Sequence, residues 1–510
     1  MATIDFCIMA AMVIYLLMML AIGFVFSKNN SDSTDFYLGG RKMGPLVTAM
    51  SAEASDMSSW LLLGLPGLAY FSGICEPFWT ALGLGVGTYL NWLFVAKRLR
   101  RYSSNIDAFT VPQFFSKRYH DSKNLLSAIA AVVIIVFFVP YTASGFSACG
   151  KLFNSLFGVN YTVAMIISAL IIIGYTIMGG FKAVSTTDFI QSIVMTLALV
   201  VVLGYGITVA GGWGAVVDNA RALPGHISLT NIYDASTGSA ASYGGVIAII
   251  STLAWGLGYF GMPHILLRFM AVEDENKLKL SRRVASVWVF IAMAAAIIIG
   301  VVGLGVSKVG ALEYLDDASK AETIIVRMSD LIAQHGVATA LLAGVILAGV
   351  LAATMSTADS QMLAAASSVS ENIIVEFMGM KLDDKKKLLI ARIAIVCIGI
   401  LGVCFALNPN SSVFRIVSFA WAGFGGAFGS VMLLSLFWKR ANLQGALAGM
   451  ISGGTMVFIW KFLIKPLGGV FGIYELLPAF IVSMIFMVVV SLLTAAPDDS
   501  IVKEFEKVNV

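Results

Sequence analysis

Two carboxylates and several hydroxyls lie within one hydrophobic stretch near the start of the chain. The run from Ser51 to Trp60 reads Ser-Ala-Glu-Ala-Ser-Asp-Met-Ser-Ser-Trp and contains Glu53 and Asp56. An ionised aspartate at the centre of a membrane helix costs roughly 2.5 to 3.5 kcal/mol on insertion scales, so it usually has a partner or a function. We expect Asp56 to act at a polar site, the structural alternative being a cap on an internal helix break. For Glu53 a structural role is as good an explanation as a functional one.

A second run rich in hydroxyls, from Ala352 to Gln361, contains Ser356 and Thr357. Serine and threonine in membrane helices often bond back to the carbonyl one turn earlier, which is the structural alternative here. A small hard cation needs a cage of oxygens. Two hydroxyls and the free carbonyls of an unwound helix can supply that cage. The expected ligands are Ser356 and Thr357 with the carbonyls of Ala54 and Met57.

Two further carboxylates accompany hydroxyls in the same way. Asp359 and Ser360 lie on the helix face that Ser356 occupies, one turn further along. Asp188 follows Ser185-Thr186-Thr187 at the start of another hydrophobic stretch. With Gln191 three residues later, Asp188 fits a helix N-cap with a capping box as well as it fits an ion ligand. Both readings of Asp188 stay open at this point.

Glycine and proline interrupt two of the hydrophobic stretches that must position these groups. The first interruption is Gly64-Leu65-Pro66-Gly67, and the second lies between Trp255 and Pro263. A pair of broken helices in corresponding positions of two halves is typical of the binding site of a secondary transporter. The sequence therefore indicates transport rather than catalysis.

The composition requires a membrane protein of many spans. Of the 510 residues, 59% are hydrophobic and 12% are charged. The hydrophobic residues are more than the core of a soluble protein can bury. We predict about thirteen stretches long enough to cross a bilayer, and hence an all-α polytopic fold. These stretches are 5–27, 45–72, 75–97, 123–152, 160–180, 188–210, 244–270, 282–306, 335–376, 387–407, 412–438, 443–463 and 473–495.

The distribution of positive charge predicts the orientation. With the N-terminus outside, most of the 33 lysine and arginine residues fall on the cytoplasmic side, where membrane proteins carry the excess. Lys28 and Arg268 are among the residues placed there. The first stretch begins without a basic region and is read as a retained span. We predict a multi-pass protein of the plasma (inner) membrane with its N-terminus outside and its C-terminus in the cytoplasm.

Other classes of function find little support in the sequence. The net charge of +4 follows from the loop bias and does not indicate nucleic-acid binding. Gly256-x-Gly258-x-x-Gly261 has the spacing of a dinucleotide fingerprint, but it lies in a hydrophobic stretch without the strand that the motif needs. The five cysteines are scattered and imply neither a disulfide framework nor a metal site. We expect a protein in a lipid bilayer that is not an enzyme and has no cofactor, nucleic-acid partner or obligatory protein partner.

The two broken stretches lie five spans apart, which predicts an inverted repeat because an odd repeat length reverses the orientation of the second unit. We expect four regions. Residues 1–44 hold the first helix and a cytoplasmic loop, and 45–210 form the first five-helix repeat. Residues 211–438 form the second repeat with a preceding extracellular loop, and 439–510 add two helices and a cytoplasmic tail.

Over nearly its whole length, from about residue 35 to 495, the chain resembles the sodium/solute symporter family, and within it the bacterial sodium/proline symporters. The resemblance lies in long, specific strings rather than in single residues. These are Tyr37-Leu38-Gly39-Gly40-Arg41, the run from Ser51 to Trp60 with the following Gly64-Leu65-Pro66-Gly67, the run from Trp255 to His264, Met355-Ser356-Thr357, and the run from Ala420 to Gly425. Ser59 departs from the best-known pattern, which has glycine there.

The resemblance implies a leucine-transporter-like core of five plus five helices with flanking helices, and it assigns roles by position. The central sodium site implied is formed by the carbonyls of Ala54, Met57 and Ala353 with the hydroxyls of Ser356 and Thr357, and Asp56 matches a functionally important aspartate. The substrate site implied is lined by Tyr141, Trp255, Tyr259 and Pro263, with Ser58 and Trp60 close by. Arg41 is expected near the cytoplasmic gate. Some relatives hold a second sodium at an aspartate like Asp188, and here Ser356, Asp359 and Ser360 complete that set, so the number of sodium ions stays open.

The function we expect is import of L-proline by alternating access, with sodium as the coupling ion. One alternative is a sodium symporter of the same family for pantothenate, a sugar acid or a monocarboxylate. Another is a membrane sensor that binds the solute without moving it. Competition by unlabelled proline for uptake distinguishes a proline symporter from the first alternative, a symporter for another solute.

Overall fold

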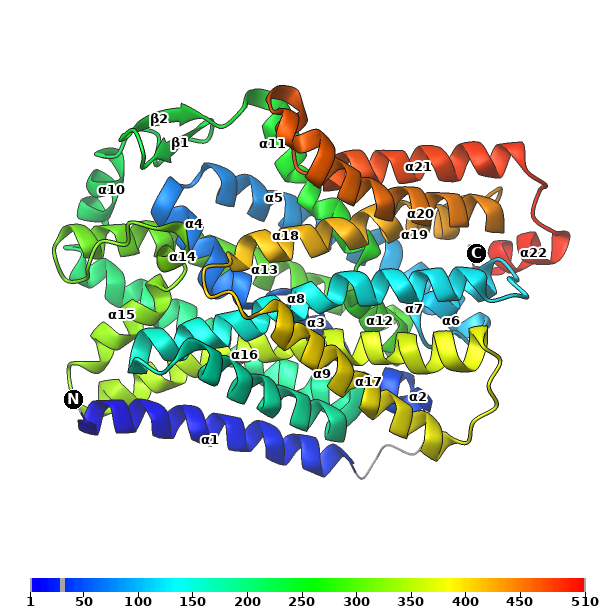
Figure 1. The fold of residues 1–510 in the computed structure, drawn as a ribbon, viewed down its shortest axis with the longest axis horizontal. Coiled ribbons are helices and arrows are strands. Elements are labelled where there is room, and N and C mark those ends of the chain that lie inside the picture. Colours follow the sequence, from blue (N-terminus) through cyan, green and yellow to red (C-terminus); the bar gives the residue numbers. More distant parts are fainter. Residues whose placement is uncertain (1, 28–32, 509–510) are drawn as a thin grey trace.

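A computed structural model describes residues 2–27 and 33–508, and Lys28 lies outside this described part. Long helices run roughly parallel to one another along most of the molecule (Figure 1). The N-terminus, together with α10 (Trp213–Arg221) and the β1–β2 hairpin, lies at one end, and the C-terminal helix α22 (Asp499–Val508) lies at the other (Figure 1). A bundle of this kind that begins and ends on opposite sides fits an odd number of crossings.

Ten helices in the described part are long and apolar enough to cross a membrane, or eleven when one bent pair is counted as a single span. The predicted count of thirteen is therefore not confirmed. The difference arises at two places. The predicted spans 160–180 and 188–210 lie in one element, α9 (Tyr161–Val209), and the first broken helix is too short to pass in one piece.

A straight helix of the 49 residues of α9 would be about 74 Å long at 1.5 Å per residue, far more than a bilayer core of about 30 Å. Gly180 interrupts it with φ 62° and ψ −168°, so α9 consists of two helices joined at a sharp kink. Only glycine adopts this backbone conformation without strain. Asp188 therefore lies two turns inside the second helix rather than at its start, and the N-cap reading is wrong.

The first broken helix comprises α3 (Pro45–Asp56), the π-helical η2 (Trp60–Gly64) and α4 (Leu65–Ser72). The break lies at Met57, with φ −75° and ψ 66°, and not at the glycine and proline further along. Pro66 lies at the start of α4, directly after the π-helical turn η2. Gly67 instead allows close packing, because a Cβ there would lie 2.7 Å from the Glu322 backbone.

The second broken helix comprises α11 (Gly245–Leu253), the 3₁₀-helical η4 (Ala254–Gly261) and α12 (Pro263–Ala271). Its two parts meet at 46°, and Met262 between them is extended, with φ −77° and ψ 107°. The predicted interruption is confirmed here. Gly256 lies so close to Gly83 of the neighbouring helix that any side chain would collide with the Gly83 carbonyl oxygen.

The remaining helices surround these two broken ones. α16 packs against α8, α9 and α3, and α1 packs against α9 and α16. α20 and α21 pack along each other on the opposite side of the bundle from α1 (Figure 1). The other elements of the first half are α1 (Ala2–Ser27), α2 (Ser33–Leu38), η1 (Gly39–Arg41), α5 (Cys75–Leu90), η3 (Asn91–Val95), α6 (Ala96–Asn105), α7 (Val111–Arg118), α8 (Leu125–Phe157), β1 (Asn231–Asp234) and β2 (Ser239–Ser242). Those of the second half are η5 (Glu275–Lys277), α13 (Leu278–Lys308), α14 (Ala318–Ala321), α15 (Ile324–Ala333), α16 (Val337–Ser367), η6 (Ser368–Phe377), α17 (Asp384–Phe405), α18 (Val413–Phe424), η7 (Gly425–Gly429), α19 (Ser430–Phe437), α20 (Leu443–Ile459), η8 (Trp460–Ile464), η9 (Lys465–Leu467), η10 (Gly469–Gly472) and α21 (Leu476–Leu493).

Candidate functional site

The break in the first helix faces the hydroxyls of α16. The Ser356 hydroxyl donates to the Ala54 carbonyl at 2.8 Å and lies 3.2 Å from the Ala353 carbonyl. The Thr357 hydroxyl lies 3.3 Å from the same Ala353 oxygen. All four residues are buried. The structure thus places Ala54 of the first broken helix against the turn of α16 that holds Ala353, Ser356 and Thr357. The two contacts with Ala353 are also the bonds within one helix that the structural alternative expects, and the fifth predicted ligand, Met57, is the non-helical residue at the break.

Asp56 links the two broken helices. Its Oδ2 accepts a hydrogen bond from the Tyr259 hydroxyl of η4, while its Oδ1 has no hydrogen-bond partner among the described residues. The Asp56 carbonyl accepts from the Trp60 indole at 3.2 Å and from the Ser58 N–H at 2.8 Å. The carboxylate therefore lies between the two breaks, with one oxygen free to take a further partner.

Aromatic rings surround the second break. Trp255 lies with its ring centroid 6.3 Å from Trp60, and Tyr259 packs edge-to-face on Trp421 at 5.0 Å. The Trp421 indole donates to the Trp255 carbonyl at 2.7 Å. Trp60, Trp255, Tyr259 and Trp421 form what we call the ring cluster. It is a buried apolar wall beside Asp56.

Three other predicted substrate residues are also buried near the two breaks. Tyr141 lies in α8, and its hydroxyl has no hydrogen-bond partner among the described residues. Ser58 lies in the break itself, and Pro263 begins α12. An unpartnered buried hydroxyl at Tyr141 is available to a polar group of a ligand.

The second predicted sodium site has an arginine in it. The Arg268 guanidinium donates to Asp188 at 3.0 Å and to Ser360 at 2.6 Å. The carboxylate of Asp359 accepts from the Tyr175 hydroxyl at 2.8 Å and lies 3.3 Å from the Ser360 hydroxyl. Arg268 is 1% exposed, so its guanidinium lies inside the bundle and not in solvent. A sodium ion bound by Asp188 and Ser360 requires this guanidinium to move.

Glu53 serves a packing role. Its Oε1 accepts from the Trp92 indole at 2.8 Å and from the Thr88 hydroxyl at 3.0 Å, both on the α5–η3 helix. These bonds tie α3 to its neighbour and favour the structural reading of Glu53.

Arg41 joins three elements at the end of the bundle where α6 and α12 finish. Its guanidinium donates to the Met270 carbonyl at 2.8 Å and to the Ser103 carbonyl at 3.1 Å, and it also bonds the Ala108 carbonyl. Burial, and then the neighbouring Arg100, lowers the pKa of the Arg41 guanidinium to about 10, so it stays charged at neutral pH. A cation bound to three carbonyls can hold this end of the bundle closed.

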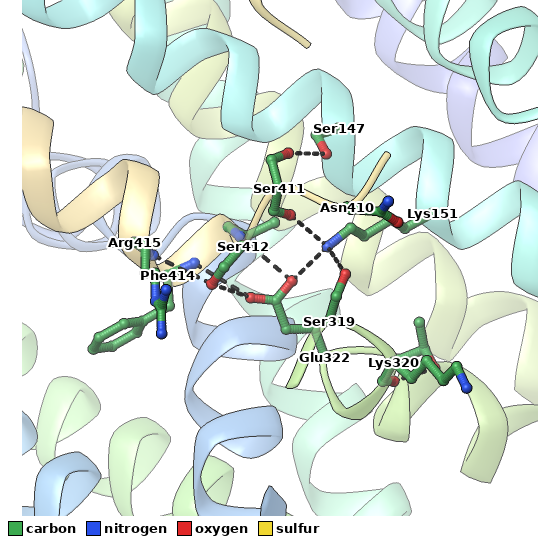
Figure 2. Close-up of polar contacts among 12 residues, drawn as sticks. Ser147, Lys151, Ser319, Lys320, Glu322, Asn410, Ser411, Ser412, Phe414 and Arg415 are labelled. Atoms are coloured by element: carbon green, nitrogen blue, oxygen red, sulfur yellow. Dashed lines mark hydrogen bonds and ion pairs between the residues drawn. The ribbon is translucent and has the colours of Figure 1, made fainter. Parts of the chain in front are cut away.

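A buried ion pair lies beside α14, at the opposite end of the bundle (Figure 1). Lys151 Nζ lies 2.7 Å from Glu322 Oε2, and it also donates to the Ser411 carbonyl at 2.7 Å (Figure 2). Glu322 Oε1 accepts from the Ser412 hydroxyl at 2.9 Å. The two charged side chains are 7% and 4% exposed. This cluster, which we call the outer latch, joins α8, the loop around α14 and the start of α18.

Several of these residues were missed by the sequence analysis. Trp421 belonged to a string used for the resemblance but was given no role, and Lys151 and Glu322 were not singled out. Lys151 is a lysine within a long apolar run, which is a signal that such a residue has a buried partner. Its partner is 171 residues away in the chain, which no local pattern indicates.

Comparison with known proteins gives the family. The model of the sodium:solute symporter family matches residues 36–453. The chain belongs to the sodium:solute symporter family. It is 41% identical over 485 residues to the osmoregulated proline transporter OpuE of Bacillus subtilis, covering 95% of this chain and 94% of that protein. It is 38% identical over 502 residues to a sodium/proline symporter of Staphylococcus aureus, covering 97% and 94%.

A solved structure confirms the fold of this symporter-family chain. The structure of a Na+-coupled sialic acid symporter, in a substrate-bound outward-open state, matches with a TM-score of 0.76 at 18% identity, over 96% of this chain and 99% of that one. The predicted leucine-transporter-like architecture of a polytopic helical membrane protein is thereby confirmed. Membership in a family of transporters also agrees with the prediction of transport rather than catalysis.

Proposed function

We propose that this chain imports L-proline across the plasma membrane together with sodium, by alternating access. The observation that carries the proposal is the junction of the two broken helices, where Tyr259 bonds Asp56 beside the Ser356–Ala54 contact. The proline-transporter names of relatives at 38% and 41% identity support the choice of substrate.

Sodium binds, in this proposal, among the carbonyls of Ala54, Met57 and Ala353 and the hydroxyls of Ser356 and Thr357. Ser356 meets Ala54 across the α3–α16 interface, and Ser356 and Thr357 both lie within hydrogen-bond distance of the Ala353 carbonyl inside α16, which places four of the five residues close to one another. Oxygen ligands of this kind suit a hard cation. Because the ligands come from two elements, bound sodium fixes the position of the first broken helix relative to α16.

Proline presents a carboxylate, a secondary ammonium and an apolar ring, and the site offers a partner for each. Amides exposed at a helix break suit a carboxylate. The free Asp56 oxygen and the Tyr141 hydroxyl suit an ammonium. Trp255 and Tyr259 suit the ring by packing and cation–π attraction. Trp60, Ser58 and Pro263 complete the pocket in this proposal, and Arg41 closes its cytoplasmic side.

Coupling follows from linkage. If sodium favours the outward-open state, it raises the affinity for substrate, and the substrate raises the affinity for sodium by the same factor. One sodium ion moving down about 100 mV yields roughly 2.3 kcal/mol. A tenfold gradient adds about 1.4 kcal/mol. Together, about 3.7 kcal/mol sustains roughly 500-fold accumulation of a zwitterion.

The proposal also covers the arrangement of the chain. The regions 45–210 and 211–438 act as the two repeats, with 1–44 and 439–510 flanking them, the N-terminus outside and the C-terminus in the cytoplasm. A second sodium at Asp188, Asp359 and Ser360 stays a weaker proposal, because Arg268 bonds two of those three residues.

The test is uptake of labelled L-proline into proteoliposomes under an inward sodium gradient, compared with a potassium gradient. Unlabelled proline, other amino acids and pantothenate serve as competitors. Sodium-dependent uptake that only proline and close analogues block is expected. If pantothenate or a monocarboxylate blocks uptake instead, the substrate is that solute and not proline. If uptake does not depend on sodium, the assignment of the sodium site is wrong.

A further inference from the structure

A hairpin from outside the two repeats reaches the ring cluster. The chain from Lys465 to Glu475 lies between α20 and α21, the two added helices, and Tyr474 lies near its end. The Tyr474 N–H donates to the Ser251 hydroxyl of α11 at 2.7 Å. The Tyr474 hydroxyl donates to the Ser418 carbonyl of α18 at 2.6 Å. One residue of the hairpin is therefore fixed to both the second broken helix and α18.

The Tyr474 ring covers one face of Trp255. The two ring centroids are 5.0 Å apart and the planes are inclined by 20°, which is a stacked arrangement. Phe414 packs on the same indole at 5.5 Å, and Trp60 lies at 6.3 Å. Because Trp255 is 3% exposed, these neighbours leave its side chain little freedom.

The chain on either side of Tyr474 is itself anchored. Glu475 is 2% exposed and is paired with Lys465 at 2.9 Å and Lys461 at 3.6 Å. Leu476, fully buried at the start of α21, packs against Gly425 so closely that a Cβ there would collide with it. The Tyr474 hydroxyl is fixed by its bond to Ser418, and the Tyr474 backbone is fixed by the Ser251 bond, the half-buried ion pairs of Glu475 and the packed Leu476, so the ring acts as a fixed support.

We propose that Tyr474 sets the size of the ring that the substrate pocket accepts, by holding the Trp255 indole in place from behind. Tyr474 is a positioning residue, since it acts through Trp255. The inference rests on the proposed function, in which Trp255 and Tyr259 pack on the proline ring. It gives the two added helices a role in specificity that the five-plus-five core alone does not supply.

The test compares Tyr474→Leu and Tyr474→Phe with the wild type in sodium-driven uptake. The readouts are KM and Vmax for proline, and the ratio of inhibition constants for proline and pipecolate, its six-membered homologue. Loss of a stacked pair predicts a KM about 2- to 12-fold higher for Tyr474→Leu, with Vmax nearly unchanged. The preference for proline over pipecolate should fall by a similar factor. Tyr474→Phe keeps the stack and should keep the preference.

Tyr314→Leu is the matched control. Tyr314 is also a tyrosine whose ring packs on another aromatic ring, that of Tyr70 at 6.0 Å, but this pair lies away from the ring cluster. This variant should leave the preference unchanged. An unchanged preference in Tyr474→Leu, or equal relaxation in the leucine and phenylalanine variants, would overturn the inference alone. A wild type without sodium-driven proline uptake would overturn the proposed function, and the inference with it. If Tyr474→Leu does not fold, Glu475→Gln, which loosens the same support, should relax the preference, and its failure to do so would count against the inference.

Discussion

Ser356 and Thr357 show how a residue-scale pattern predicts a contact. Two hydroxyls in an apolar helix suggested oxygen ligands, and the structure places both within reach of carbonyls, one of them in a distant helix. The partner of Asp188 was not predictable in the same way. Arg268 is 80 residues from Asp188, and the packing of α12 against α3, which itself packs against α9, brings the two together. The sequence analysis used Arg268 only as a positive charge of the cytoplasmic side and gave it no partner.

Replacing both hydroxyls, Ser356→Ala with Thr357→Ala, should raise the sodium concentration for half-maximal uptake by about tenfold or more. The reason is that each lost bond to a charged group is worth about 1.5 kcal/mol or more. The sodium dependence of proline uptake measures the effect. Ser367→Ala, further along α16 and bonded only to its own helix at 2.8 Å, is the control. Unchanged sodium dependence in the double variant would contradict the assigned ligands.

The Arg268 contacts lead to a prediction about the number of ions. Because the guanidinium already supplies a positive charge to Asp188 and Ser360, we expect one sodium per cycle. Initial uptake plotted against sodium concentration should give a Hill coefficient close to 1. A coefficient close to 2 would show that a second sodium enters, and that Arg268 leaves these partners when it does.

At the scale of elements, the sequence located both broken helices but misplaced one break. Glycine and proline indicated the second break correctly, at η4. In the first helix the chain opens at Met57, while Gly64 and Gly67 serve close contacts with Phe414 and Glu322. A glycine in a membrane helix permits close packing as readily as a break, and the sequence alone does not distinguish the two.

The outer latch predicts a conformational effect. Glu322→Gln leaves the buried Lys151 ammonium without its counter-charge, which disfavours the state in which this end is closed. The population should shift toward the outward-open state, with tighter apparent sodium binding and slower turnover. Hydrogen exchange of residues 318–323 should become faster, as measured by mass spectrometry.

Two further variants serve as controls for Glu322→Gln. Asp316→Asn breaks the exposed pair with Lys320 on the same loop, 2.8 Å long, and should have little effect because exposed pairs contribute little. Lys151→Met combined with Glu322→Gln should recover part of the turnover, because no unpaired buried charge remains. Turnover that is equal to wild type in Glu322→Gln would mean that the latch does not control closure.

At the scale of the whole molecule, charge and hydropathy predict the topology, and the two broken helices predict the repeat. The described termini lie at opposite ends of the bundle (Figure 1). The number of spans was harder to predict, since two of the predicted spans lie in the kinked element α9 and one helix is broken into short pieces.

The orientation gives a prediction at this scale. A tag at the N-terminus should be accessible to protease in intact cells, and a tag at the C-terminus only after the membrane is opened, because this orientation is the one that puts most lysine and arginine residues on the cytoplasmic side. Fluorescent reporters that mature on only one side of the membrane provide an independent measurement. Accessibility of the C-terminal tag in intact cells would reverse the assignment.

The central claim is that proline and sodium cross together. Proline is a zwitterion, so the charge moved in each cycle is the charge of sodium. The most direct measurement is the current evoked by L-proline in proteoliposomes on a solid-supported membrane. We predict a current that carries positive charge inward when sodium is present, and no current when potassium replaces sodium. In the Ser356→Ala, Thr357→Ala double variant the current should be strongly reduced at the same sodium concentration. Proline uptake without any current, or a current of equal size in potassium, would contradict the central claim.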